Sequence, residues 1–129
     1  MKPTPTPEQQ ARFDALLAWL DGGGDERAAF NMAYFHCVDE DVTCSTTCCI
    51  GGFVLANEYN LFNTHSFYRG VSAHNPDTVD CAVLVGQLLG MPDYLANNLC
   101  YTWSCSTDTQ AAAKRVRHYL DTGELPPAQ

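Results

Sequence analysis

The amino-acid sequence predicts an all-α protein, a compact single-domain bundle of about six helices. Apolar side chains recur at spacings of three and four residues in successive stretches, as they do along one face of an α-helix. Helix start and stop signals bracket these stretches, and no stretch alternates convincingly with the two-residue period of a strand. A chain of 129 residues is long enough to bury a core without disulfides.

The predicted domain covers residues 6–124, between a disordered leader at 1–5 and a tail at 125–129. The N-terminal residues contain no apolar segment of the kind that a secretory signal requires. No apolar run approaches the roughly 20 residues that span a bilayer. We therefore expect a cytoplasmic protein without membrane contact.

The first two helices are predicted from their caps and apolar faces. Thr6 and Gln9 form a capping box around a proline, and glycines after Asp21 end the first helix. Asp25 is expected to cap a second helix, which would place several apolar residues on one inward face. These residues are Phe30, Ala33, Tyr34 and Cys37.

The third helix, from about residue 47 to about residue 59, is expected to be central because its apolar residues wrap more than one face. The adjacent glycines Gly51 and Gly52 weaken a helix but allow close helix contact. Residues 60–75 show no helical period and contain several large aromatic side chains. We interpret them as a cover over the core, with a partner-binding loop as the alternative.

Three further helices are predicted in the second half of the chain. The first of these is the most apolar and opens on an Asn-Pro pair, and the last follows a capping box. Their expected limits are Asn75 to Gly90, Pro92 to Tyr101 and Thr107 to Thr122.

Charge restricts the class of partner. The net charge of −8 comes from 15 Asp and Glu against only seven Lys and Arg. Direct nucleic-acid binding is not expected, because it depends on Lys and Arg neutralising phosphates. A protein partner is expected and a basic one is compatible with the charge, while the oligomeric state stays open.

Seven cysteines are the most reactive groups in the sequence, and buried free thiols are their simplest interpretation in a reducing compartment. One alternative is a zinc-binding module, although the ligand spacing is poor for a structural site. Its ligands would be His36, Cys37, Cys44 and Cys48. Apart from zinc, no cofactor is expected.

A second alternative is a thiol enzyme. A cysteine at the start of the third helix, Cys48 or Cys49, would be the nucleophile, because amide dipoles favour a thiolate there. The base would be His65, His74 or His118. No catalytic motif surrounds these residues, so no catalytic residue is predicted.

Three short motifs occur in a recognisable order: CSTTCCIGG from Cys44, TDTQAA from Thr107 and HYLDTGE from His118. This order resembles small uncharacterised bacterial and phage proteins with a CxxxCI(A/G)G element and a closing T-x-x-Q-A-A…H-x-L-x-T-G-E helix. The chain departs from that pattern at Gly51, where alanine is usual, and at Phe53, where tryptophan is usual. The resemblance implies a helical, intracellular protein of phage or prophage origin and assigns no active site.

The sequence therefore favours a non-enzymatic, acidic interaction protein that binds and modulates a host or phage macromolecule. Inhibition of a bacterial defence system is one specific form that we consider. The candidate interaction surface combines the acidic turn with aromatic residues of the two irregular segments. Its residues are Asp39, Glu40, Asp41, Phe62, Phe67, Tyr68 and Trp103.

Overall fold

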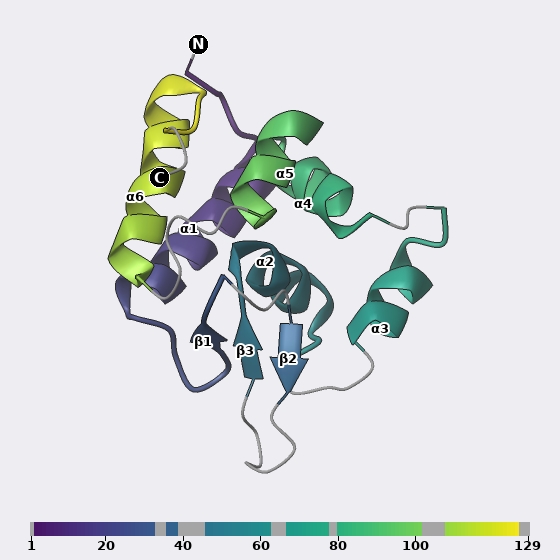
Figure 1. Ribbon diagram of the computed structural model, residues 1–129. Coiled ribbons are helices and arrows are strands. Elements are labelled where there is room, and N and C mark those ends of the chain that lie inside the picture. The colour runs from purple at the N-terminus through teal and green to yellow at the C-terminus, as the bar shows by residue number, and fades with distance from the viewer. Residues whose placement is uncertain are drawn as a thin grey trace.

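Helices dominate the architecture and surround a central one (Figure 1). The computed structural model describes residues 2–32, 36–38, 46–62, 67–77, 80–101 and 108–126. Within these ranges the helices are α1 (Pro7–Asp21), α2 (Ile50–Tyr59), α3 (Phe67–His74), α4 (Cys81–Leu89), α5 (Asp93–Tyr101) and α6 (Thr109–Thr122). The strands are β1 (Ala29–Phe30), β2 (His36–Val38) and β3 (Thr46–Cys48). The predicted all-α class with about six helices is confirmed.

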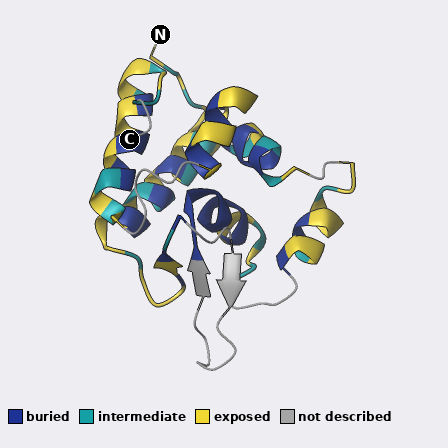
Figure 2. Cartoon of the chain, viewed as in Figure 1, coloured by how far each residue is buried: buried dark blue, intermediate teal, exposed yellow. Residues whose placement is uncertain are grey.

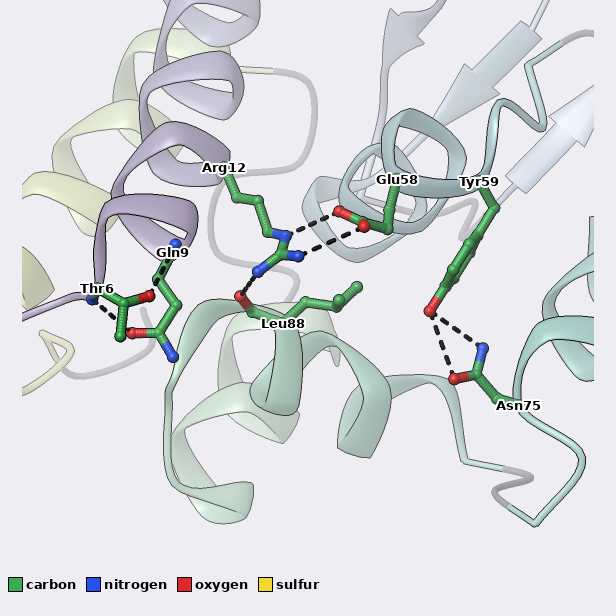
Figure 3. Close-up of polar contacts among 7 residues, drawn as sticks. All are labelled: Thr6, Gln9, Arg12, Glu58, Tyr59, Asn75 and Leu88. Atoms are coloured by element: carbon green, nitrogen blue, oxygen red, sulfur yellow. Dashed lines mark hydrogen bonds and ion pairs between the residues drawn. The ribbon is translucent and has the colours of Figure 1, made fainter.

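The first helix forms where its capping signals predicted. The Thr6 side chain accepts a hydrogen bond from the Gln9 amide at 3.2 Å, and the Gln9 side chain accepts one from the Thr6 amide at 2.9 Å (Figure 3). Together these bonds satisfy amides that the first turn leaves without helical partners. The helix ends at Asp21, directly before the glycines.

The second predicted helix does not form, and a small sheet takes its place. Its strand order is β1-β3-β2, with β1 parallel and β2 antiparallel to β3. Asp25 caps a turn instead of a helix, because its carboxylate accepts from the Arg27 amide at 2.8 Å. The Trp19 indole then donates to the Ala28 carbonyl at 2.9 Å and holds the chain at the start of β1. The side chain of Cys37, predicted to point inward, lies outside the described residues.

The central helix is α2, as predicted, and it is buried continuously from Ile50 to Ala56 (Figure 2). It begins a few residues later than expected, because residues 46–48 pair with the other strands. Cys49 caps it, with the Gly52 amide donating to the Cys49 sulfur at 3.5 Å. Both Gly51 and Gly52 are buried within the core.

The middle of the chain differs from the prediction in two ways. Residues 67–74, where no helix was predicted, form α3, which buries Phe67 and Val71 on one face. Helix α4 begins at Cys81 with Asp80 as its N-cap, well after Asn75. The Asn75 amide instead donates to the Val71 carbonyl and to the Tyr59 hydroxyl, so it closes α3 and ties it to α2 (Figure 3).

The last helices follow the predicted limits more closely. Helix α5 ends at Tyr101 as expected. Helix α6 is capped by Asp108, which accepts from the Gln110 and Ala111 amides at 3.1 Å, while Thr107 lies outside the described residues. Beyond it, Leu125 packs partly buried against the core. In the described ranges, no helix combines the length and apolar character that a membrane crossing needs.

Helices α4 and α5 form a tight hairpin. Gly90 adopts a left-handed conformation with φ of 74° and turns the chain between them. A Cβ on Gly86 would lie 3.0 Å from the Ala96 Cβ and 3.0 Å from the Met91 carbonyl oxygen. The two helices therefore touch closely at Gly86, which fixes the position of α5.

Candidate interaction face

Exposed aromatic residues gather on two helices. Among the described residues, the exposed large hydrophobic side chains are Tyr68, Tyr94 and Tyr101, with exposed fractions of 56%, 72% and 49%. Tyr68 lies on α3, and the other two lie on α5. We call these three residues the tyrosine face.

The amphipathic pattern of α5 explains why two tyrosines point outward. The helix buries Leu95, Ala96, Leu99 and Cys100. Tyr94 and Tyr101, seven residues apart, lie on the opposite side, because seven residues make about two helical turns. At 1.5 Å per residue, the Cα atoms of this pair lie about 10 Å apart along the helix axis.

The third tyrosine, Tyr68, lies on α3, which packs against α2 (Figure 1). Burial raises the pKa of Tyr68, and the nearby Cys81 and Cys49 thiols raise it further. Burial likewise raises the pKa of Tyr101 to about 12, with contributions from Asp80 and from the same two thiols.

The sequence stretch that contains α4 and α5 carries acidic residues and no basic ones. The sequence contains no Lys or Arg between Arg69 and Lys114, a stretch that includes all of α4 and α5. The same stretch carries four aspartates, all exposed: Asp77, Asp80, Asp93 and Asp108. The hairpin's own charged side chains are therefore acidic, while Arg12 of α1 donates to the Leu88 carbonyl of α4 and Arg115 of α6 donates to the Asn98 side chain of α5.

A buried arginine fixes α5 against α6. Arg115 is only 6% exposed, and its guanidinium donates to the Asn98 side chain at 2.8 Å and to the Pro126 carbonyl at 3.1 Å. Its Nε has no hydrogen-bond partner within the part of the chain that the structure describes. Since Asn98 lies one turn after Tyr94, this contact holds the outer side of α5 in place.

The structure separates the aromatic residues that the sequence nominated. Tyr68 is exposed, but Phe67 beside it is only 2% exposed and is not a surface residue, because it faces the core from α3. Phe62 is half-buried, with its ring 5.7 Å from that of Phe53. The interpretation of these two phenylalanines as a cover over the core is confirmed. Asp39, Glu40, Asp41 and Trp103 lie outside the described residues.

Sequence reasoning missed Tyr94 and Tyr101 as surface residues. The signal was present in the helix that it predicted from Pro92 to Tyr101, because the spacing of Leu95 and Leu99 marks the inner side of that helix. Positions 94 and 101 then fall on the outer side. The large residues opposite the buried face of an amphipathic helix are exposed, and here they are the two tyrosines.

The cysteines of the described residues are poor nucleophiles. Cys48, Cys49 and Cys100 are buried and Cys81 is half-buried, and all four are free thiols. Burial raises the pKa of Cys49 to about 11, and it also raises the pKa of each of the other three. These thiols therefore stay protonated near neutral pH. Of the candidate bases, His74 stacks on Tyr59 at 4.6 Å, His118 lies exposed on α6, and His65 lies outside the described residues.

The candidate zinc ligands are described only in part. The strand register places His36 opposite Cys48 and Cys37 opposite Thr47. Cys44 and the side chains of His36 and Cys37 lie outside the described residues, whereas Cys48 is fully buried. Among described side chains, no three His, Cys, Asp or Glu residues are grouped as a metal ion would require.

Comparison with known proteins finds no family model, no curated protein and no solved structure that matches the chain. The resemblance to bacterial and phage proteins therefore stays a prediction from the short motifs alone. Functional inference rests on the geometry of the tyrosine face.

Proposed function

We propose that this protein is a non-enzymatic interaction protein that binds a protein partner through the tyrosine face. The observation that carries the proposal is the position of the exposed large hydrophobic side chains of the described residues, all of them tyrosines on α3 and α5. Tyrosine is enriched in protein interfaces and among the residues that dominate binding energy. It combines a large apolar ring with a hydroxyl group that keeps the free surface soluble.

The rigid support beneath α5 favours the same function. Close packing at Gly86 and the contact between Asn98 and Arg115 fix the helix on two sides. A tyrosine side chain has only two rotatable torsions, so ordering it against a partner costs little conformational entropy. A pre-positioned helix with such side chains loses little freedom on binding.

The two alternatives receive no support from the described residues. A thiol enzyme needs a cysteine with a lowered pKa, whereas burial raises the pKa of Cys49 and of the other three described cysteines. A zinc-binding module would depend on Cys44 and on side chains that lie outside the described residues. We propose that the biological effect is modulation of a host or phage macromolecule, for example by blocking a bacterial defence protein.

Photocrosslinking tests the proposal at a defined position. Tyr94 is replaced by p-benzoylphenylalanine, and the protein is irradiated in an extract of cells that naturally contain it. The control carries the same group at Glu8, an exposed residue in the first turn of α1. We expect a discrete crosslinked protein from position 94 that position 8 does not give.

The captured protein is then purified and its affinity for the wild-type chain is measured by calorimetry. Tyr94→Ser is expected to weaken this binding by about tenfold or more, as truncation of an interface anchor does. Tyr94→Phe keeps the ring and is expected to preserve most of the affinity. Equal crosslinking from both positions, or undiminished affinity of Tyr94→Ser, would refute the proposed function.

A further inference from the structure

We propose that the Arg115 guanidinium, where α6 meets α5, is a binding site for the carboxylate group of a ligand. The inference goes beyond the proposed function, because this site can bind its ligand whatever the tyrosine face contacts. Three observations support it: a buried cation whose described partners are neutral, a donor on one edge of the guanidinium without a partner, and a completed example of the same contact elsewhere in the fold.

Arg115 is a buried cation among neutral acceptors. It is only 6% exposed, and arginine keeps its positive charge inside proteins. Its guanidinium donates to the Asn98 side-chain oxygen at 2.8 Å and to the Pro126 carbonyl at 3.1 Å, and neither acceptor carries a charge. Every ion pair among the described residues belongs to a different arginine. A buried charge is costly unless it is paired, so Arg115 favours an anion as a further partner.

One edge of the guanidinium matches a carboxylate. Nη1 donates to Pro126 and Nη2 donates to Asn98, while Nε has no hydrogen-bond partner among the described residues. The Nε and Nη2 groups lie side by side on the same edge of the planar group, and such an edge binds the two oxygens of a carboxylate through parallel hydrogen bonds. The single oxygen of Asn98 serves only one of these two nitrogens. A carboxylate serves both.

Arg12 shows the completed contact in the same protein (Figure 3). Its Nη1 donates to the Leu88 carbonyl at 2.8 Å, its Nε donates to one oxygen of Glu58 at 2.7 Å, and its Nη2 donates to the other at 3.4 Å. Arg115 repeats the backbone contact of Nη1, but it has the neutral oxygen of Asn98 where Arg12 has a carboxylate. The ligand carboxylate would therefore take the role at Arg115 that Glu58 has at Arg12.

A ligand can reach this edge without disrupting either helix. Asn98 is exposed, so its side chain can rotate away from the guanidinium into water. Pro126 is half-buried and follows Gly123, where the left-handed backbone with φ of 80° has already ended α6. Movement of residues 124–126 therefore leaves the hydrogen bonds of α6 intact.

The surrounding charges limit the affinity. The other Asp, Glu, Lys and Arg side chains of α5, α6 and residues 124–126 are all exposed: Asp93, Lys114, Arg117, Asp121 and Glu124. Three of these five are acidic, and the protein as a whole has a net charge of −8. Both facts oppose the approach of an anion, although exposed charges are screened by salt. We therefore expect binding in the millimolar range for a ligand that offers little more than its carboxylate.

Nuclear magnetic resonance of the arginine Nε–H groups tests the contact directly. The Arg115 signal is assigned from its backbone, and the signal of Arg69, exposed on α3, is the control for general attraction of anions. The probes are acetate, acetylglycine, the neutral acetylglycinamide and inorganic phosphate. We expect both carboxylates to shift the Arg115 signal saturably, with a Kd of about 10 mM or tighter, and the amide to leave it unchanged. Phosphate, which is larger and tetrahedral, is expected to bind more weakly than either carboxylate.

The two carboxylates distinguish the source of the group. Tighter binding of acetylglycine indicates that the site reads the carboxyl end of a peptide, whereas tighter binding of acetate indicates a small carboxylic acid. Either order supports the inference.

Two matched variants test the site without removing Arg115. Asn98→Asp gives the guanidinium a carboxylate from the chain, so it is expected to raise the Tm by about 3 °C or more. It is also expected to weaken acetylglycine binding by about tenfold or more, because the edge is then paired. Asn97→Asp makes the same charge change at the neighbouring exposed position. It is expected to leave the Tm within about 1 °C and the affinity within about twofold.

Several results would overturn the inference. It is wrong if neither carboxylate shifts the Arg115 signal, if the Arg69 signal shifts as much, or if phosphate binds more tightly than both carboxylates. It is also wrong if Asn98→Asp and Asn97→Asp bind acetylglycine with equal affinity, since Asn98 would then not adjoin the site. Photocrosslinking at position 94 decides the proposed function separately, because it depends on Tyr94 and not on Arg115.

Discussion

Two groups of aromatic residues in this protein have opposite surroundings. The first, which we call the closed cluster, consists of Trp19, Phe53 and Phe62 with Arg27 over the two phenylalanines. Trp19 stacks on Phe53 with ring centres 4.3 Å apart and planes 9° apart. The second is the tyrosine face, whose rings stand on α3 and α5 and are about half exposed or more.

The difference shows how the same chemistry can serve stability or binding. In the closed cluster the rings are covered, and a cation from the same chain occupies the outer side. At the tyrosine face the chain provides carboxylates and leaves ring surface in water. An exposed ring contributes little to folding, since it gains nothing from burial. Substitutions in the two groups should therefore have very different effects on stability.

Trp19→Ala should give the largest effect, because it empties the middle of the closed cluster. Trp19 is 2% exposed, and its indole also donates to the Ala28 carbonyl. Loss of a buried aromatic side chain typically costs about 3 to 5 kcal/mol in the free energy of unfolding. Urea denaturation followed by circular dichroism measures this value. Tyr94→Ala is the matched control, and a cost below about 1 kcal/mol for Trp19→Ala would remove the distinction between the two groups.

High pH should destabilise the protein through the buried thiol of Cys49, the N-cap of α2. Burial raises the pKa of Cys49 from the ordinary value of 9.0 to about 11. The folded state therefore holds this proton when the unfolded chain has lost it, so stability is complete below pH 9 and falls as the pH rises toward 11. At about 1.4 kcal/mol per unit, this group alone gives a loss of roughly 3 kcal/mol.

Cys49→Ser isolates that contribution. Serine keeps the helix cap but does not titrate in this range. The other thiols and phenols with raised pKa values remain: Cys48, Tyr68, Cys81, Cys100, Tyr101 and Tyr119. Thermal unfolding from pH 8 to pH 11 is expected to show a shallower decline for this variant. Parallel curves for variant and wild type would mean that the Cys49 thiol is hydrated and that the residues around it are not closely packed.

Gly86→Leu should test the rigid support of α5. Because a Cβ at this position already meets Ala96 and Met91 at 3.0 Å, a larger side chain must push the two helices apart. Overpacking of this kind costs about 1 to 3 kcal/mol in the free energy of unfolding. Gln87→Leu, at the exposed neighbouring position, is the control. If both variants unfold at the same urea concentration as the wild type, α5 is not held at Gly86.

Local signals in the sequence were sufficient for some elements and insufficient for others. The capping box at Thr6 predicted α1 correctly, because the cap and the first helical turn are only three residues apart. The sheet was missed because its strands are two and three residues long, too short to show a period. Its pairing of Phe30 with Cys48 also depends on residues distant in sequence. Asp25 suits a helix cap and a turn equally well, and its tertiary surroundings decide between them.

The candidate site was predictable only in part for a related reason. The outward position of Tyr94 and Tyr101 follows from the period of a single helix. The position of Tyr68 relative to them does not, because it depends on how α3 packs against α2. Phe67 is buried because it lies on the face of α3 that packs against the core. This could not be predicted, because the sequence of residues 60–75 shows no helical period.

The smallest effects on stability should come from substitutions on the outer sides of the closed cluster and of the tyrosine face, where the two groups can be compared directly. Arg27→Gln removes the cation over Phe53 and Phe62, together with its exposed ion pair to Asp25. The Arg27 side chain is 46% exposed, and a cation–ring contact at an exposed site contributes about 0.5 to 1 kcal/mol, so the variant should lose about that amount. Tyr94→Ser should change stability by less than about 0.5 kcal/mol, since the ring is 72% exposed.

Differential scanning calorimetry of the two variants, with Arg69→Gln on α3 as a control for lost surface charge, measures both effects in one buffer. The expected order is a lower Tm for Arg27→Gln and an unchanged Tm for Tyr94→Ser and Arg69→Gln. The order matters more than the size, because it separates a ring whose cation lies within the fold from a ring that the fold leaves in water. If Tyr94→Ser lowered the Tm as much as Arg27→Gln, Tyr94 would contribute to the stability of the fold. Its exposure would then no longer be evidence that a partner binds there.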